Sequence, residues 1–273
     1  MATDTKALVF PYRKMVSDIP FPENLAVRSL SIAAPAYNEG EGIVPVVEHW
    51  LEYLRKRTDL ESFEIVICND GSQDDTGNKL RAIAASNPQL VIVEHAANQG
   101  AGAALRTAIA GTGSEWVLLI DSDGQFPIEN FERLLDCVQQ TGAPAVVGIR
   151  TKKLDGAFAR FGSWSSGFLC NAFHGTHYRD FNSACKLVRG DLLRSLHLEC
   201  KGLNYSTEVT SKLVERGVEI AEAEIVHQHR VAGTSSLRKF RGARDRLLFV
   251  LYLGFRQFLL RMRIITVSKY AAQ

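Results

Sequence analysis

The 273-residue chain has few cysteines, and none of them are spaced for a metal site or a disulfide framework. Its five cysteines are an odd number, lie far apart and include no Cys-x-x-Cys pair. Small disulfide-bonded domains and zinc sites both need closely patterned cysteines, so the sequence argues against both classes. We therefore expect a reduced, cytosolic setting.

The chain also lacks long apolar runs and a strong excess of one charge. No stretch reaches the roughly 18 uninterrupted apolar residues that a transmembrane helix needs. The N-terminus does not have the basic-then-apolar layout of a signal peptide. Lys and Arg number 32 against 30 Asp and Glu, for a net charge of only +2. A protein that binds nucleic acid through its overall field needs far more positive charge, so we expect no nucleic-acid partner.

The sequence does contain a regular alternation of short apolar runs and helical patterns. This alternation predicts an α/β fold with a Rossmann-like, mostly parallel sheet flanked by helices. The strand candidates are residues 30–34, 63–68, 90–94, 116–120 and 145–149. We expect an N-terminal arm over residues 1–29, a catalytic domain over 30–240 and a C-terminal amphipathic helix over 241–273.

The most informative motif is Asp121-Ser122-Asp123-Gly124-Gln125, which directly follows the apolar run 116–120. In open α/β sheets ligands bind at the carboxyl ends of the strands, so these polar side chains are placed where a ligand would lie. Asp121, Asp123 and Gln125 offer only oxygen ligands at their acceptor atoms, which suits Mg²⁺ or Mn²⁺. The alternative is a turn in which Asp and Gly serve only local structure.

Polar turns follow three other predicted strands as well. Glu39 follows the first strand, Asn69 and Asp70 follow the second, and a loop with Gly100 and Gly102 follows the third. Asn69 and Asp70 offer acceptors to the N–H groups of a base, and Glu39 offers one to a ribose hydroxyl. The two glycines allow close approach of backbone to a nucleotide. The first strand is not followed by Gly-x-Gly-x-x-Gly, which argues against an ordinary dinucleotide fold.

In combination these motifs resemble the inverting family 2 glycosyltransferases with the A-type nucleotide-sugar fold, and within them the dolichol-phosphate mannose synthase-like branch. The resemblance covers roughly residues 30–240. The matching stretches are PAYNE (35–39), NDGSQDDT (69–76), NQGAGAAL (98–105), DSDGQ (121–125), VGIR (147–150), DFNSACKL (180–187) and HQHRVAGTS (227–235). Two departures are Asn69, where the family usually has Asp, and a looser form of the segment that starts at Asp180.

The resemblance implies a division of roles along the chain. The residues expected to bind the nucleotide sugar are Pro35, Tyr37, Glu39, Asn69, Asp70, Gly100, Asp121 and Ser122. Those expected to take part in catalysis are Asp121, Asp123, Arg150 and Arg230. Those expected to bind the phosphate of a lipid acceptor are Arg150, Arg160, Arg230 and Ser235. A planar guanidinium engages two phosphate oxygens at once, which is why arginine suits this task. His227 is a further candidate, although a lone histidine is more often structural.

The C-terminal segment is strongly apolar between residues 247 and 265 but carries Arg256, Arg261 and Arg263. An apolar helix with flanking cations suits the headgroup region of an anionic membrane, so we expect a peripheral enzyme on the cytoplasmic face of a membrane. The alternative is a helix packed on its own domain or on a second subunit of a homo-oligomer.

The predicted function is therefore metal-dependent, inverting transfer of a hexose from a nucleotide diphosphate sugar, such as GDP-mannose or a UDP-hexose, to a polyprenyl or dolichyl phosphate. Two alternatives stay open. One is transfer to a soluble sugar, glycan or small molecule, which requires a carboxylate base, with Asp180 as the candidate. The other is a non-catalytic regulator that binds a nucleotide sugar.

Overall fold

The computed structural model describes residues 27–151, 157–230 and 239–267. Its centre is one seven-stranded sheet in the order β3-β2-β1-β4-β6-β5-β7. The strands are β1 (Ser29–Ala36), β2 (Ser62–Asn69), β3 (Leu90–Glu94), β4 (Trp116–Leu119), β5 (Ala145–Arg150), β6 (Lys186–Arg189) and β7 (Ile220–Ile225). All pairings are parallel except those of β6, which is antiparallel to both β4 and β5. This confirms the predicted fold class, and all five predicted strands are present.

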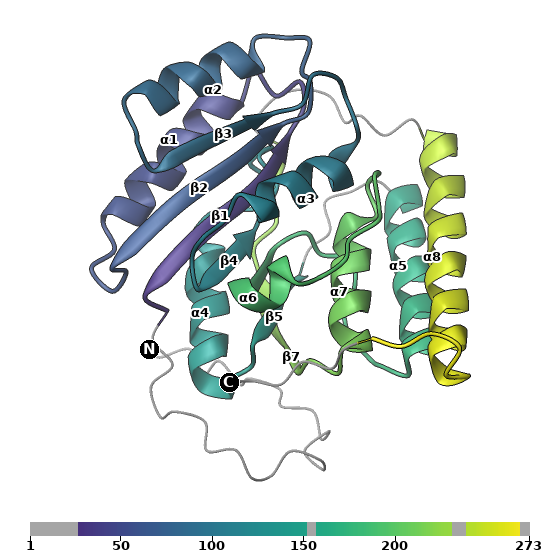
Figure 1. Ribbon diagram of the computed structural model, residues 1–273. Coiled ribbons are helices and arrows are strands. Elements are labelled where there is room, and N and C mark those ends of the chain that lie inside the picture. The colour runs from purple at the N-terminus through teal and green to yellow at the C-terminus, as the bar shows by residue number, and fades with distance from the viewer. Residues whose placement is uncertain (1–26, 152–156, 231–238, 268–273) are drawn as a thin grey trace.

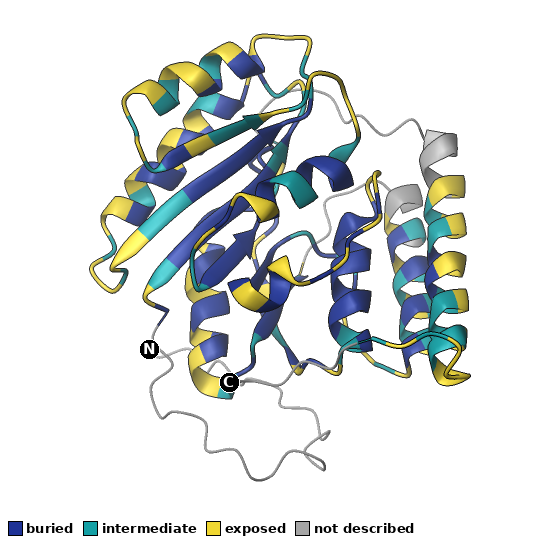
Figure 2. Ribbon diagram, in the orientation of Figure 1, coloured by how far each residue is buried: buried dark blue, intermediate teal, exposed yellow. Residues whose placement is uncertain are grey.

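Helices cover both faces of the sheet (Figure 1). They are α1 (Ile43–Arg55), α2 (Thr76–Ala85), α3 (Ala101–Ala110), α4 (Asn130–Thr141), α5 (Ala157–His174), α6 (Gly190–Arg194), α7 (Tyr205–Glu215) and α8 (Lys239–Arg261). Side chains of α1 and α4 pack on one face, and those of α3, α6 and α7 pack on the other. The central strands are therefore buried on both sides (Figure 2), which explains why they are continuous apolar runs.

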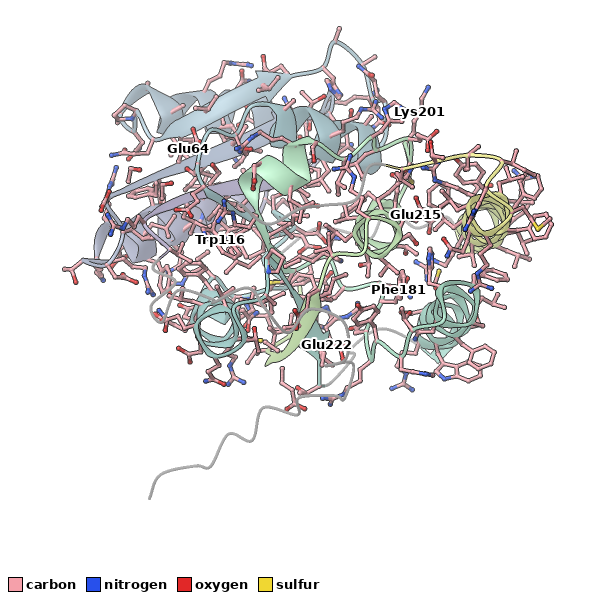
Figure 3. All side chains as sticks on the ribbon, turned by 60° about the horizontal axis from the view of Figure 1, so that its bottom comes forward. Glu64, Trp116, Phe181, Lys201, Glu215 and Glu222 are labelled. Atoms are coloured by element: carbon pink, nitrogen blue, oxygen red, sulfur yellow. The ribbon has the colours of Figure 1, made fainter. Side chains whose placement is uncertain are left out.

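The C-terminal helix α8 lies along α5 at one end of the molecule (Figure 1). Val250 and Leu253 of α8 are buried in a small cluster with Cys170 of α5 and with Phe181. Figure 3 shows Phe181 between α5 and α7, and Glu215 between α7 and α8. The Glu215 carboxylate accepts a hydrogen bond of 2.9 Å from Arg256. The helix predicted from the C-terminal segment is therefore present, and one of its faces is packed on the domain.

Gly100 and Gly102 at the start of α3 lie against the backbone of residues 200–202. The Gly102 N–H donates to the Lys201 carbonyl at 2.9 Å. A Cβ atom on Gly100 would lie 2.2 Å from that carbonyl oxygen, and one on Gly102 would lie 2.2 Å from the Cys200 carbonyl oxygen. The close approach that these glycines allow is thus to the chain itself. A role of Gly100 in nucleotide binding stays a prediction.

We predict that Gly102→Ala destabilises the protein, because its methyl group would overlap a backbone carbonyl that has no room to move. Overpacking of this kind typically costs about 1–3 kcal/mol in the free energy of unfolding. Gly202→Ala is the matched control, because a Cβ there has no heavy atom within 4 Å. Urea unfolding of both variants measures the difference. Equal stability of the two would contradict the packing seen at the start of α3.

Candidate active site

The carboxyl ends of β1, β4, β5 and β7 lie at one edge of the sheet, and the acidic motif lies at the end of β4. Asp123 is buried, and its Oδ1 accepts a 2.9 Å hydrogen bond from the Gln125 N–H. The Ser122 hydroxyl donates to the Pro35 carbonyl at 2.8 Å, which ties the end of β4 to the end of β1. Gly124 has a φ of 74°, a left-handed conformation that glycine adopts readily. The turn is therefore held in shape by its own sequence.

Arg230 joins two of the predicted acidic residues. Its Nη1 lies 2.7 Å from Glu39 Oε1, and its Nη2 lies 2.9 Å from Asp123 Oδ2. The segment before Arg230 is fixed to the acidic turn, because Gln228 donates from its backbone to the Gln125 carbonyl and from its side chain to the Gly124 carbonyl, each at 2.9 Å. The structure thus brings Glu39, Asp123 and Arg230 together, and the roles assigned to them stay predictions.

Tyr205, the first residue of α7, was not among the predicted site residues. Its hydroxyl donates a short hydrogen bond to Asp121 Oδ1. Burial and the neighbouring Asp121 charge raise the pKa of Tyr205 well above its ordinary value, so it stays a proton donor. The two residues are 84 positions apart, and the sequence around Tyr205 has no catalytic motif. Only the fold shows that this tyrosine belongs to the site.

The acidic side of the site carries more negative than positive charge. Glu39, Asp121 and Asp123 are three carboxylates, and Arg230 forms ion pairs with two of them. The charge of Arg150, which is itself paired with Asp180, also acts on Asp121. Burial, followed by the charge of Asp123, raises the pKa of Asp121 to about 6. Burial is also the largest cause that raises the pKa of Glu39. A site of this kind has a deficit of positive charge.

These residues fit a divalent cation. The described residues include no group of three His, Cys, Asp or Glu side chains arranged around a metal. Mg²⁺ usually needs only one or two carboxylates, because waters and substrate phosphates complete its shell. Asp121 and Asp123 supply two carboxylates in a site that is short of cations, and Gln125 offers a further oxygen. The assignment of these three residues as ligands stays a prediction.

Asn69 and Asp70 have different neighbours, although the sequence predicts that both bind a base. The Asp70 carboxylate accepts from His95 Nδ1 at 2.7 Å and from the N–H groups of Gln99 and Gly100 at 2.9 and 2.8 Å. The Asn69 amide instead donates to Glu94 at 3.2 Å. Asn69 also lines a pocket of about 450 Å³ between the turns that follow β2 and β3. Asp70 holds the loop before α3, so most of its acceptor capacity is used within the protein.

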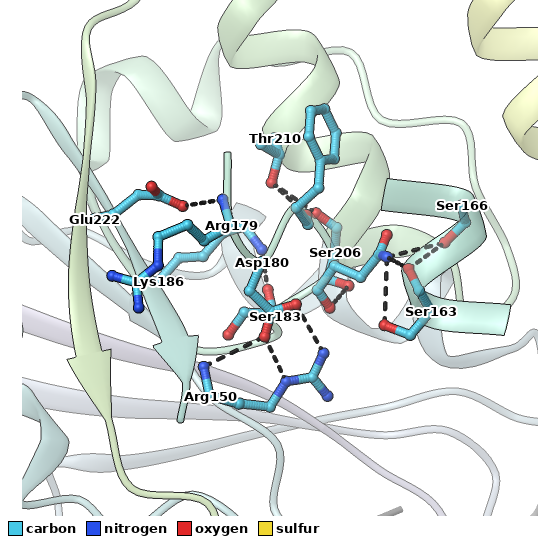
Figure 4. A network of polar contacts seen from close by, with 12 residues as sticks. Arg150, Ser163, Ser166, Arg179, Asp180, Ser183, Lys186, Ser206, Thr210 and Glu222 are labelled. Carbon is cyan, nitrogen blue, oxygen red and sulfur yellow. Dashed lines mark hydrogen bonds and ion pairs between the residues drawn. The ribbon is translucent and has the colours of Figure 1, made fainter. Parts of the chain in front are cut away.

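Arg150 at the end of β5 forms a bidentate ion pair with Asp180 (Figure 4). Its Nε lies 2.8 Å from Asp180 Oδ2, and its Nη2 lies 3.0 Å from Oδ1. Both side chains are nearly inaccessible to solvent, at 11% and 1% exposure. Asp180 therefore fixes the direction of a guanidinium that the sequence assigned to the acceptor phosphate.

The remaining predicted site residues have no direct contact with the acidic turn among the interactions described above. Arg160 is exposed on α5, Tyr37 is partly buried after β1, and Ser235 lies outside the described residues. His227 is buried with its ring 5.1 Å from that of Phe126. Packing on Phe126 suits a structural role for this histidine, and its role in the site stays a prediction.

Comparison with known proteins identifies relatives for most of the chain. The sequence model of the family described as Glycosyl transferase family 2 matches residues 31–205. A dolichyl-phosphate beta-glucosyltransferase of Trichomonas vaginalis is 32% identical over 121 residues, which cover 42% of this chain and 36% of the relative. An undecaprenyl-phosphate mannosyltransferase of Micrococcus luteus is 26% identical over 217 residues, which cover 74% of this chain and 85% of the relative.

Several of these relatives are longer than the matched region. The chain matches 62% of the length of an undecaprenyl-phosphate 4-deoxy-4-formamido-L-arabinose transferase of Pectobacterium atrosepticum, at 25% identity over 77% of this chain. Among solved structures, glucosyl-3-phosphoglycerate synthase of Mycobacterium tuberculosis with Mn²⁺ and UDP-glucose has a TM-score of 0.63 at 20% identity, covering 83% of this chain and 79% of that one. At this identity the likeness shows a shared fold.

We predict that Asp121→Asn stabilises the folded protein in a pH-dependent way. The folded-state pKa of Asp121, about 6, is above its ordinary value of 3.8, so ionisation of this carboxylate opposes folding. Wild type carries no such cost below pH 3.8 and the full cost above pH 6. The variant should therefore melt at a higher temperature than wild type at pH 7.5, and at about the same temperature near pH 4.

Asparagine keeps an oxygen that accepts the Tyr205 hydrogen bond, so the variant isolates the effect of charge. Asp136→Asn, at an exposed position of α4, is the matched control and should leave the melting temperature unchanged at both pH values. A lower melting temperature of Asp121→Asn at pH 7.5 would mean that the nearby arginines and Tyr205 already stabilise the ionised carboxylate.

Proposed function

Because the chain belongs to glycosyl transferase family 2, we propose that it transfers a hexose from a nucleotide diphosphate sugar to a polyprenyl phosphate, with inversion at the anomeric carbon. The observation that carries the choice of acceptor is the pairing of the carboxylates around the site. Asp180 is bound by Arg150, Asp123 and Glu39 by Arg230, and Asp121 by Tyr205. A hydroxyl acceptor needs a carboxylate that is available to take its proton, whereas an ionised phosphate does not.

Arg150 supports the same choice of acceptor. Its guanidinium is held rigid by Asp180 at the end of β5, beside the acidic turn. A fixed guanidinium next to the leaving group is suited to orient a phosphate that attacks the sugar, and orientation of this kind supplies much of a rate enhancement. The relatives named above act on dolichyl or undecaprenyl phosphate by their names. Dolichyl or undecaprenyl phosphate is therefore the first acceptor to test.

The acidic turn of residues 121–125 is suited to bind the nucleotide diphosphate of the donor sugar. Mg²⁺ or Mn²⁺ held by Asp121, Asp123 and Gln125 would act as a Lewis acid for the departing nucleotide diphosphate. Arg230 is bound to Asp123 and Glu39, and we assign it a contact with the diphosphate oxygens of the bound donor. Tyr205 orients the Asp121 carboxylate through its hydroxyl hydrogen bond. We also assign donor contacts to Pro35, Tyr37 and Ser122, which lie where β1 and β4 end.

We predict that the purified protein transfers hexose to undecaprenyl or dolichyl phosphate, and that Asp123→Ala lowers this activity at least about a hundredfold, because it removes a carboxylate from the leaving-group side. EDTA should have the same effect on wild type. The assay combines GDP-mannose and UDP-glucose with both lipid phosphates and measures the glycolipid formed.

Asp136→Ala, at an exposed position on α4, is the matched acidic control and should be fully active. A parallel reaction with 3-phosphoglycerate in place of the lipid tests the soluble-acceptor alternative. Full activity of Asp123→Ala would reject the metal-binding turn. Product from phosphoglycerate and none from lipid would reject the polyprenyl acceptor, and donor binding without transfer to any acceptor would support the regulator.

We further propose that the enzyme works on a membrane surface, through the outer faces of α5 and α8. The described helices include none that is long and apolar enough to cross a membrane. Several large apolar side chains are nevertheless exposed on these two helices: Trp164, Phe168, Leu247, Leu248, Leu251, Phe255 and Phe258. Trp164 and Phe168 stack with their ring centroids 5.8 Å apart. An exposed apolar surface of this extent usually marks an interaction site.

The charge of α8 favours lipid over a second copy of the chain. Its sequence has six Lys and Arg residues and one acidic residue, Asp245. In a symmetric dimer both copies would bring the exposed Arg261 to the interface, whereas anionic headgroups would complement its charge. Arg256 does not contribute as the sequence suggested, because Glu215 binds it at 2.9 Å. Arg261 and Arg263 are exposed and fit a salt-dependent contact.

We predict that Trp164→Ser with Phe168→Ser weakens binding to anionic vesicles at least about tenfold, because two aromatic side chains no longer enter the lipid. Vesicle co-sedimentation measures this, and wild-type binding should fall with added salt. Val91→Ser, at an exposed apolar position of β3, is the control. Unchanged vesicle binding together with a smaller particle in light scattering would assign the surface to a homo-oligomer.

A further inference from the structure

The turn of residues 180–183 begins with Asp180, the carboxylate that binds Arg150. The Ser183 N–H donates to the Asp180 carbonyl at 3.2 Å, which closes the turn. The Asp180 side chain accepts from Nε and Nη2 of Arg150 at 2.8 and 3.0 Å. Because this ion pair is bidentate, it sets the direction of the guanidinium. Whatever fixes the turn therefore also fixes the direction of Arg150.

Asn182 is the residue that joins this turn to two helices. Its Nδ2 donates to the Ser163 carbonyl at 2.7 Å and to the Ser166 hydroxyl at 2.9 Å, both on α5. Its Oδ1 accepts from the Thr207 hydroxyl of α7 at 2.6 Å. Its backbone carbonyl accepts from the Ser206 hydroxyl at 2.9 Å. Figure 4 shows the three serines beside the turn. Both ends of the amide are therefore bound.

The partners of Asn182 also determine which way its amide faces. The Ser163 carbonyl has no proton to donate, so the amide nitrogen has to face it, and the amide oxygen is left for the Thr207 hydroxyl. The residue between Asp180 and Asn182 is held as well, because the Thr210 hydroxyl donates to the Phe181 carbonyl at 3.0 Å. The turn is thus fixed to α5 and α7 by side chains that suit only one arrangement.

The helix α5 connects this turn with the surface that we propose meets the membrane. Ser163 and Ser166 are 9% and 4% exposed and bind Asn182. Trp164 and Phe168 of the same helix are 62% and 60% exposed. The phosphate of a membrane lipid lies at the membrane surface, so a guanidinium that orients it has to keep a constant position relative to that surface. One helix carries both the exposed aromatic side chains and the partners of the turn.

We propose that Asn182 is a positioning residue for the acceptor phosphate: it fixes the turn of residues 180–183 to α5 and α7, so that Asp180 holds the Arg150 guanidinium at a constant place relative to α5. This inference rests on the proposed transfer to a polyprenyl phosphate. The Asn182 amide is bound by the two helices, so it acts through Asp180 and Arg150. Misplacement of an orienting group by about 1 Å costs on the order of a hundredfold in rate, so loss of this anchor should be measurable in transfer.

The competing explanation is that Asn182 only holds α5 against α7. The chain offers a matched control for this explanation, because His174 Nε2 and the Ser211 hydroxyl, 3.0 Å apart, tie the same two helices through residues outside the turn. Ser211→Ala removes that contact. Thr207→Val removes the hydroxyl that binds Asn182, whereas Thr207→Ser keeps a hydroxyl there. Thr207→Val therefore provides a test even where Asn182→Ala fails to fold.

The experiment measures kcat/KM for undecaprenyl phosphate and the dissociation constant of the nucleotide sugar in these four variants, with melting temperatures alongside. Asn182→Ala and Thr207→Val should lower kcat/KM for the acceptor at least about tenfold and leave donor binding unchanged, because only the acceptor guanidinium loses its fixed position. Thr207→Ser should transfer at the wild-type rate. Ser211→Ala should lower the melting temperature and leave transfer unchanged.

A double-mutant cycle with Arg150→Ala separates positioning from packing. If Asn182 acts through Arg150, Asn182→Ala should cause no further loss of acceptor kcat/KM in the Arg150→Ala background. Additive losses in this cycle, unchanged transfer in both Asn182→Ala and Thr207→Val, or an equal loss in Ser211→Ala would each overturn the inference. If wild type neither transfers hexose to undecaprenyl phosphate nor binds farnesyl phosphate in calorimetry, the proposed function fails and the inference fails with it.

Discussion

Three carboxylates lie where β1 and β4 end, and Arg230 forms ion pairs with two of them. The rest of the site depends on this excess of carboxylates. Glu39, Asp121 and Asp123 would repel one another if Arg230 were absent, yet Arg230 contacts only two of them. The third, Asp121, has the hydroxyl of Tyr205 instead. A neutral donor does not supply a charge, so the pKa of Asp121 stays near 6. Gln228 donates one backbone and one side-chain hydrogen bond to carbonyls of this turn, and these bonds hold the neighbouring Arg230 close to the carboxylates.

The end of β5 carries a guanidinium in place of the carboxylate cluster. There Arg150 forms a bidentate ion pair with the buried Asp180, and the buried Lys186 begins the neighbouring strand β6. The insertion of β6 between β4 and β5 separates the two regions and brings its own lysine next to the second one. A metal-bound diphosphate suits the carboxylate-rich turn, and a phosphate that carries its own charge suits the guanidinium of Arg150. The two substrates of the proposed reaction therefore match two neighbouring groups of charged side chains.

The parts of the fold that were predictable are those that sequence periodicity controls. Parallel strands covered on both faces must be continuously apolar, so β1 to β5 were readable as short apolar runs. The turns after them were readable because chemistry at a sheet edge requires polar residues. β6 and β7 were missed: β6 begins with Lys186, and β7 includes Glu222 and Glu224, so neither is a continuous apolar run.

The missing parts of the site share one physical cause. Tyr205 binds Asp121, 84 positions away, and Asp180, which the sequence suggested only as a possible base, instead binds Arg150. A sequence shows residue types without showing which of them meet. The same limit explains Gly100 and Gly102, whose glycine pattern suggested approach to a nucleotide but which lie against residues 200–202. Asp70 is a further case, since its carboxylate holds the loop before α3.

The helix α8 shows that packing and surface exposure are not alternatives. The sequence offered a choice between a helix on a membrane and a helix packed on the domain. In the structure Val250 and Leu253 are buried against α5, while Phe255 and Phe258 on the same helix are exposed. A helix with apolar side chains on two faces satisfies both demands, because one face completes the protein core and the other is left for an apolar partner. Loss of the whole helix would remove both contacts at once, so only substitutions on the exposed face separate them.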